Sequence, residues 1–417
     1  MTSPRRYRLF EVTGIELEYP TVDADLRVRH LVEPLFRRLA GRPVSDVERG
    51  GTVFSNELAA HVFEIKTAGP RRSLAVAERQ LVQGLQPVIK LLREEFGSRL
   101  LPTGMHPFMD PAEGRTWPRA GRGIYETYSR LFDTRGHGWM NVQSCHINLP
   151  FGDEKETVLL HNAIACLMPY LPALSASSPI FAGRLGPDVD NRLAFYRTNQ
   201  KRIPHISGKV VPEFMSSFAQ YKRDIFAPIY RDLRKIPGGG RLCHEWINSR
   251  GASVRFNRRA IEIRVLDTQE CVRMDIAIAS FIRAVLRTMV GWLASGEMAL
   301  PDHAMLVADF DRTVRAGGEA EVNAGHFKPW LRRHRRRLTP RDVLRRLFEE
   351  SAGKVPSDEA QYLPLVAYRL RKGSLAERIR REVHRRLGRR GASRRDVIRG
   401  VYEELALCLE QNRPWTR

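Results

Sequence analysis

The stretch Gly14-Ile15-Glu16-Leu17-Glu18-Tyr19 alternates apolar and acidic side chains. A period of two is typical of a β-strand with one buried face, and we expect a strand over residues 7–19. On such a strand Glu16 and Glu18 point to the same side, away from the core. This segment therefore predicts a sheet that carries carboxylates on one face.

Three further segments alternate in the same way and are expected to be strands: residues 61–66, 144–149 and 260–265. Their polar faces carry Glu64, His146 and Glu262, and Glu57 precedes the first of them. Carboxylates on one sheet face repel one another unless a cation lies between them, and oxygen ligands suit Mg²⁺ or Mn²⁺. The predicted metal-facing set is therefore Glu16, Glu18, Glu57, Glu64, His146 and Glu262.

Each of these segments also has a simpler explanation when it is taken alone. A surface strand often alternates glutamate with apolar residues, as at Glu16 and Glu18. A lone histidine such as His146 is usually a hydrogen-bonded core residue. Glu262 and Arg264 share a strand face and could form an ordinary ion pair. The convergence of several acids favours a functional site over these explanations.

Helical patterns separate the strands. Ser73 is expected to cap a helix that ends at Gly97 and is kinked at Pro87. Further helices are expected over residues 156–168 and 275–295, and residues 175–209 are expected to form a long ordered loop. Arg283 and Arg287 interrupt the helix over 275–295, which is therefore predicted to be a buried helix and not a membrane span.

After Gly317-Gly318 the sequence becomes basic and helical. Three capping-box patterns, at Thr339, Ser374 and Ser393, predict helices that begin just after them, and residues 332–337 read as an exposed connection. We expect a catalytic domain over residues 1–300 and a basic helical region over residues 301–417.

Composition limits the class of protein. The chain has 417 residues, 42% of them hydrophobic, and five cysteines without a Cys-x-x-Cys spacing. No apolar stretch follows the basic N-terminus, so no signal peptide is expected, and the scattered cysteines indicate a reducing cytoplasm. The formal charge of +22 leaves a nucleic-acid-binding protein as an alternative. Acidic and apolar residues interleaved with the arginines argue against specific nucleic-acid binding.

Six segments occur in one order along residues 10–270: Gly14-Ile15-Glu16-Leu17-Glu18; Glu57 with Glu64-Ile65-Lys66-Thr67; Gly104-Met105-His106-Pro107-Phe108; Ser144-Cys145-His146-Ile147-Asn148; Leu174-Ser175-Ala176-Ser177-Ser178-Pro179; and Glu262-Ile263-Arg264-Val265-Leu266-Asp267-Thr268-Gln269. Together they resemble the bacterial type of glutamate–cysteine ligase and its carboxylate–amine ligase relatives. The resemblance implies an α+β fold like that of glutamine synthetase. In that fold a curved, mainly antiparallel sheet forms a half-barrel funnel with metals on its floor and helices outside.

The resemblance also implies an activity. The expected reaction couples the γ-carboxylate of L-glutamate to an amine, most simply L-cysteine, with ATP and Mg²⁺ (or Mn²⁺) through an acyl phosphate. A different amine or acid remains an alternative, and the oligomeric state is left open. Glu262 and Arg264 are the expected catalytic pair, with Arg264 facing the transferred phosphoryl group.

Other side chains are expected to hold small-molecule substrates. Arg192, Arg197, Arg250 and Arg255 flank the loop-rich region and the last acidic strand, where a guanidinium fork could bind a carboxylate or a phosphate. Ser178 lies in a segment that resembles a substrate-side loop of the family. The sequence has no Gly-x-x-x-x-Gly-Lys-Ser/Thr loop, so ATP must bind in another way.

Overall fold

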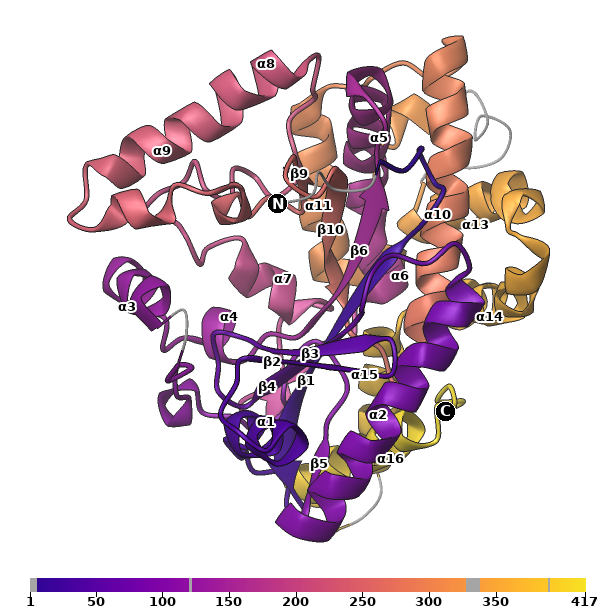
Figure 1. Cartoon of the computed structure of the whole chain (residues 1–417). Coiled ribbons are helices and arrows are strands. Elements are labelled where there is room, and N and C mark those ends of the chain that lie inside the picture. Colours follow the sequence, from indigo (N-terminus) through magenta and orange to yellow (C-terminus); the bar gives the residue numbers. More distant parts are fainter. Residues whose placement is uncertain (1–5, 120–121, 328–337, 389–390) are drawn as a thin grey trace.

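The computed structural model describes residues 6–119, 122–327, 338–388 and 391–417 (Figure 1). Its main sheet has the order β2-β3-β4-β1-β6-β10-β9, with β5 paired to the end of β1, and every pairing is antiparallel. The strands are β1 Gly14–Asp23, β2 Asp46–Arg49, β3 Thr52–Asn56, β4 Val62–Thr67, β5 Ser98–Leu100, β6 Ser144–Pro150, β9 Ala252–Arg255 and β10 Ala260–Asp267. The α+β class with a mainly antiparallel sheet is confirmed; the sheet is open and does not close into a barrel.

The first strand differs from its prediction at both ends. It begins at Gly14 and not at Tyr7, because the backbone turns at Phe10, whose φ is 60°, and Glu11 donates its N–H to the Arg8 carbonyl. It continues to Asp23, where it pairs with β5. The alternation that places Glu16 and Glu18 on one face is nevertheless correct.

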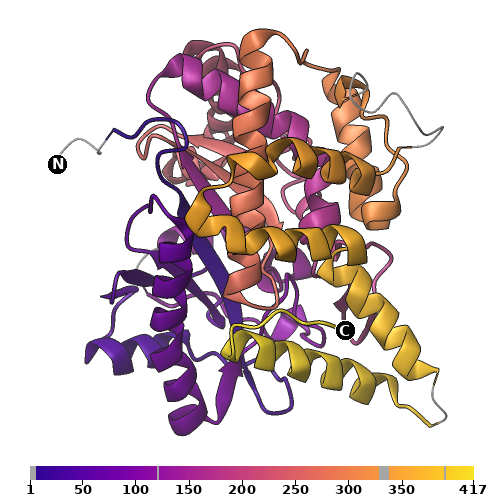
Figure 2. The ribbon, with the colours of Figure 1, turned by 90° about the vertical axis from the view of Figure 1, so that its right-hand side faces the viewer.

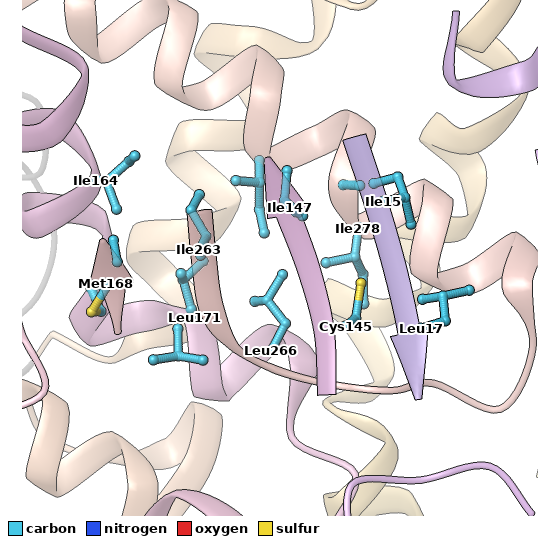
Figure 3. Close-up of a cluster of buried hydrophobic side chains, with 14 of the residues drawn as sticks. Ile15, Leu17, Cys145, Ile147, Ile164, Met168, Leu171, Ile263, Leu266 and Ile278 are labelled. Atoms are coloured by element: carbon cyan, nitrogen blue, oxygen red, sulfur yellow. The ribbon is translucent and has the colours of Figure 1, made fainter. Parts of the chain in front are cut away.

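One face of the sheet is buried against helices. Ile15 and Leu17 of β1 are fully buried and belong to the main hydrophobic core. The same face continues through Cys145 and Ile147 of β6 to Ile263 of β10 (Figure 3). The helices that cover it contribute Ile164, Met168, Leu171 and Ile278. This packing leaves the acidic side chains on the opposite face.

The covering helices follow their predictions closely. In α2 (Leu74–Phe96) the Ser73 hydroxyl accepts the Val76 N–H, and Gly97 ends the helix with φ 55°. The helix α5 (Glu154–Leu167) begins two residues earlier than expected because Asp153 caps it. The central helix α10 (Val272–Ser295) and the segment 154–175 are apolar enough to cross a membrane, but they are 72% and 89% buried inside the protein. They are core helices.

Residues 175–209 contain regular secondary structure where the sequence predicts an ordered loop. They contain the hairpin of β7 (Ile180–Phe181) and β8 (Arg184–Leu185) and the helix α7 (Asn191–Tyr196). Asp190 caps α7 by accepting the Leu193 N–H. A helix of six residues is too short to show an apolar period, so the sequence did not predict it. The remaining helices of this part are α1 Val32–Ala40, α3 Arg122–Leu131, α4 His137–Met140, α6 Leu171–Ser175, α8 Phe218–Tyr221, α9 Ala227–Arg234 and α11 His303–Ala316.

The last helices pack on the outside of the molecule (Figure 2), where α13 and α14 contact α10 and the last helix contacts β5. They are α13 Pro340–Ser351, α14 Leu363–Lys372, α15 Leu375–Leu387 and α16 Arg394–Glu410. The capping boxes at Thr339 and Ser374 are confirmed. The third is wrong: the Ser393 hydroxyl accepts no helix N–H, although α16 still begins at Arg394. The predicted connection over residues 332–337 lies outside the described residues.

Buried ion pairs join this outer layer to the rest of the chain. The Arg283 guanidinium of α10 donates to both carboxylate oxygens of Glu359 at 2.6 Å. Arg369 of α14 donates to Glu270, three residues after the end of β10, at 2.9 Å. All four side chains are at most 3% exposed. The boundary near residue 300 stays a prediction, since a single hydrophobic core includes residues from both sides of it.

Candidate active site

Three cavities lie along the acidic face of the sheet. The acidic cavity, of about 620 Å³, is lined by Glu16, Glu57, Glu64, Lys66, Arg255 and Glu262 among others. The aromatic cavity, of about 210 Å³, is lined by Glu18, His146, Arg192, Arg264 and several aromatic rings. The apolar cavity, of about 480 Å³, is lined by Val12, Ile15, Pro70, Pro150 and Ala260 among others. Glu57 faces both the acidic and the aromatic cavities, and Glu16 faces both the acidic and the apolar cavities.

The strands set the order of these cavities. On β10, Ala260, Glu262 and Arg264 line the apolar, acidic and aromatic cavities in turn. On β1, Glu16 lines the apolar and acidic cavities, and Glu18 lines the aromatic one. Because alternate residues of a strand share a face and lie about 6.6 Å apart, the three cavities form one groove along the strands.

Glu262 is held by two arginines. Arg255 donates to it from Nε at 2.8 Å and from Nη2 at 3.1 Å, and Nε of Arg264 lies 3.1 Å from Oε1. Burial opposes ionisation of Glu262, but the charges of Arg264 and Arg255 outweigh it and lower its pKa below the ordinary value. Glu262 therefore stays ionised and fixes Arg264 at the boundary between the acidic and aromatic cavities.

A second cluster links β1 and β6, where Glu16 and His146 are register partners. Nδ1 of His146 lies 3.4 Å from Glu16, and Asn148 donates to the other Glu16 oxygen at 3.1 Å. Burial raises the pKa of Glu16, but the His146 hydrogen bond lowers it further, to about 2. The Ser144 N–H and hydroxyl donate to Glu18 at 2.7 and 3.0 Å. Both glutamates are thus oriented by strand β6.

Glu57 and Glu64 are less well neutralised. Lys66 donates to Glu64 at 2.6 Å, but burial and the nearby carboxylates of Glu16 and Glu57 still raise the pKa of Glu64. Burial and the charge of Glu18 raise the pKa of Glu57 to about 8. This corner of the groove carries more negative charge than its cations balance.

The donor chemistry of the groove fits a hard divalent cation. Its ligands would be carboxylate oxygens and one imidazole, which suit Mg²⁺ or Mn²⁺. In this conformation no three acidic, histidine or cysteine side chains within the described residues are close enough to hold a metal ion. The raised pKa values of Glu57 and Glu64 nonetheless mark where positive charge is needed. The metal-facing set remains a prediction.

The structure brings only some of the predicted substrate residues to the groove. Arg192 and Arg264 line the aromatic cavity, and Arg255 lines the acidic one. Arg197 and Arg250 line none of the three cavities, because they pair with Asp311 at 3.3 Å and Glu213 at 2.5 Å.

Ser178 is also absent from the cavity walls. It is fully buried, where its hydroxyl lies 3.2 Å from Asp190 and accepts the Arg192 N–H at 3.1 Å. It therefore supports α7 and, through that helix, Arg192.

Sequence patterns did not reveal several residues of the groove. Lys66 lies within one of the six motifs without a role that its sequence pattern indicates, yet it forms an ion pair with Glu64. The rings of the aromatic cavity come from short helices without a periodic signal. These rings are Tyr125, Tyr128, Trp139, Tyr196 and Trp246. A tyrosine pair three residues apart on α3 was the only available hint.

Comparison with solved structures defines the class of fold. A glutamate–cysteine ligase of Francisella tularensis, solved in complex with AMP, aligns with a TM-score of 0.59 at 14% identity, over 97% of this chain and 90% of that one. A bifunctional glutathione synthetase of Pasteurella multocida aligns with a TM-score of 0.60 at 14% identity, over 95% of this chain and 53% of that one. The chain therefore shares the fold of these two proteins, and at 14% identity the likeness concerns the fold alone.

The sequence comparison identifies the family. The model of glutamate–cysteine ligase family 2 matches residues 12–404. An uncharacterised protein of Archaeoglobus fulgidus is 36% identical over 399 residues, which cover 96% of this chain and 98% of that protein. The chain belongs to glutamate–cysteine ligase family 2, as the sequence motifs predicted, and is therefore a ligase.

Proposed function

We propose that the protein joins the γ-carboxylate of L-glutamate to an amine at the expense of ATP, releasing ADP and phosphate. L-cysteine is the amine in the family's name and the first acceptor to test. The observation that carries the proposal is the order of the groove: apolar, then acidic, then cationic and aromatic. A base, a metal-bound triphosphate and an amino-acid substrate need these three environments in this order.

ATP would bind with its base in the apolar cavity and its phosphates in the acidic cavity. Pro70, Pro150 and Ala260 offer apolar contacts for a base. Lys66, Arg255 and Arg258 line the acidic cavity and can balance phosphate charge. The AMP bound to the Francisella tularensis ligase supports a nucleotide site on this fold.

Glu16, Glu18, Glu57, Glu64, His146 and Glu262 would hold Mg²⁺ or Mn²⁺. The ion would neutralise the triphosphate and polarise its γ-phosphorus. The chain's own part is to hold these ligands in fixed positions, as β6 does for Glu16 and Glu18.

The reaction needs no protein nucleophile. A γ-carboxylate oxygen of glutamate attacks the γ-phosphorus, ADP leaves, and an acyl phosphate forms. Arg264, held by Glu262, would stabilise charge on the transferred phosphoryl group. Arg192, fixed by Asp267 at 2.5 Å, would bind a glutamate carboxylate.

A nucleic-acid-binding function is the alternative class, and the contacts of the basic helices weigh against it. Arg346 lies 2.5 Å from Glu350, and Arg385 lies 2.6 Å from Glu382. Arg369 and Arg378 are buried. Much of the basic charge of this region is thus balanced within the protein. We further propose a cytoplasmic enzyme that acts on small molecules and could serve glutathione synthesis if cysteine is the amine.

The test is an assay for phosphate release with ATP, Mg²⁺ and L-glutamate, with hydroxylamine added to capture the acyl phosphate. We expect γ-glutamyl hydroxamate and one ADP for each hydroxamate formed. AMP with pyrophosphate, or no glutamate-dependent product at all, would overturn the proposal.

A further inference from the structure

The aromatic cavity has walls of two kinds. Its charged side chains come from the sheet and from α7, whereas its rings come mainly from α3, α4 and the short turn Glu245–Ile247. Tyr128 packs against Trp139 and Trp246 with ring centroids 5.5 and 5.9 Å apart. Such contacts hold the rings as one rigid wall. The cavity therefore offers a preformed apolar surface next to the charged floor.

The cationic side chains of this cavity suffice for glutamate but not for a second amino acid. Glutamate brings two carboxylates, and each needs a cationic partner when it leaves water. Arg192 is the partner for one, and Arg264 lies where the γ-carboxylate is phosphorylated; no other lysine or arginine lines this cavity in the described part of the chain. An amino-acid acceptor such as cysteine would bring a third carboxylate into a pocket whose arginines are already engaged.

The rest of the cavity fits an apolar amine. The faces of the aromatic rings attract an ammonium group, and Glu57 lies in the wall between this cavity and the acidic one. Glu57 also faces the acidic cavity, so an amine beside it lies next to the phosphorylated carboxylate. Leu58, Val62 and Ile124 continue the apolar lining.

We propose, building on the function proposed above, that the acceptor is a primary amine without a carboxylate that carries an aromatic or branched alkyl group. Phenethylamine and isopentylamine represent this class. The rings of Tyr128, Trp139 and Trp246 bind the apolar group, and the faces of the rings attract the ammonium group.

The chemical step balances without a further reactant. The amine loses a proton to solvent to expose its lone pair, which attacks the acyl carbon of γ-glutamyl phosphate. The carbon–oxygen bond to phosphate breaks, and the remaining surplus N–H proton leaves with inorganic phosphate. The product is a γ-glutamyl amide.

The experiment compares acceptors with the full-length protein, ATP, Mg²⁺ and L-glutamate. Phenethylamine and L-phenylalanine are a matched pair that differ only by the carboxylate. We expect kcat/KM for phenethylamine to exceed that for L-phenylalanine and L-cysteine by at least tenfold. Equal or better use of L-cysteine or L-phenylalanine overturns the inference. Hydroxylamine reacts with the acyl phosphate without a side-chain pocket. Formation of hydroxamate together with a preference for cysteine would therefore leave the proposed function intact and overturn only the inference about the acceptor. Absence of hydroxamate would overturn both the proposed function and the inference.

Variants of the wall give a second test. Trp139→Ala should raise KM for phenethylamine at least fivefold, and Trp139→Leu, which retains part of the apolar volume, should give an intermediate value. Trp292→Ala, at a ring that lines none of the three cavities, is the matched control and should leave KM unchanged. Equal KM values for Trp139→Leu, the control and the wild type would contradict binding of the amine by this wall.

Discussion

Nε of Arg192 lies 2.5 Å from Oδ1 of Asp267, and both side chains are almost completely buried. Asp267 also accepts the Ser177 N–H at 2.7 Å, and Gly104 packs so closely that a Cβ there would lie 2.3 Å from the carboxylate carbon. Three of the sequence motifs thus meet at one carboxylate. Their common effect is to aim Arg192 at the aromatic cavity.

Removing the charge of Asp267 should therefore affect both stability and glutamate binding. Asp267→Asn leaves Arg192 buried without its partner, which costs about 3 kcal/mol in the free energy of unfolding. We expect KM for glutamate to rise at least tenfold. The matched control is Asp311→Asn, which breaks the exposed pair with Arg197 and should cost less than about 1 kcal/mol with no change in KM. Urea unfolding and steady-state kinetics measure both effects.

The glutamates of β1 should be essential for turnover but not for folding. Glu16→Gln and Glu18→Gln keep the shape and remove the charge that faces the groove, so activity should fall by about 100-fold or more. Circular dichroism should remain that of the wild type. Glu95→Gln, at an exposed ion pair with Arg38, is the control. Near-normal turnover of either β1 variant at saturating Mg²⁺ would remove that residue from the site.

Isotope transfer tests the acyl phosphate and the role of Arg264 together. With oxygen-18 in the γ-carboxylate of glutamate, one label should appear in inorganic phosphate for each amide formed. Arg264→Lys should slow this step at least tenfold, because a point charge cannot replace a planar fork that spans two phosphoryl oxygens. Mass spectrometry of the phosphate measures the label. Label in AMP would indicate adenylation.

Four buried histidines should make the protein sensitive to acid. Burial lowers the pKa of His61 to about 3 and those of His106, His161 and His326 to about 4. In the unfolded chain these four histidines take up protons below about pH 6.5, whereas in the folded protein they do so only at about pH 3 to 4. The free energy of unfolding should therefore decrease as pH falls from 6.5 to 4, by up to about 1.4 kcal/mol per pH unit for each histidine. Denaturant titrations at several pH values measure the slope, and His61→Gln should reduce it by one proton.

The basic charge should behave as a property of the surface. We expect weak binding of duplex DNA that is lost steeply between 50 and 200 mM salt, because only counterion release would drive it. Fluorescence anisotropy with two unrelated duplexes measures this. Nanomolar, sequence-selective binding at physiological salt would contradict the proposed function class.

The sequence predicted the acidic face of the sheet correctly because the period of a strand is local. Glu16, Glu18 and His146 lie on one face in any register that buries Ile15 and Ile147. The motif order also predicted the family and the antiparallel fold. These predictions rest on neighbours within a few residues of each other.

Features that depend on distant partners could not be predicted. Whether an arginine faces substrate or a structural acid depends on which acid lies opposite it after folding. Arg250 meets Glu213, 37 residues away, whereas Arg192 meets Asp267, 75 residues away, and only the second pair lies at the groove. The aromatic wall likewise assembles from three short segments that have no common period.

The buried contact between Arg283 and Glu359 has a consequence for synthesis of the protein. While α10 emerges from the ribosome, its arginine has no counter-charge until Glu359, 76 residues later, has been translated. Glu270 has no counter-charge from Arg369 until that residue, 99 residues later, has been translated. Because Glu270 ends the segment that begins with Asp267, the groove reaches its final form only late in translation. The segment that follows β10 therefore reaches its final packing only after α14 has been translated and has left the exit tunnel.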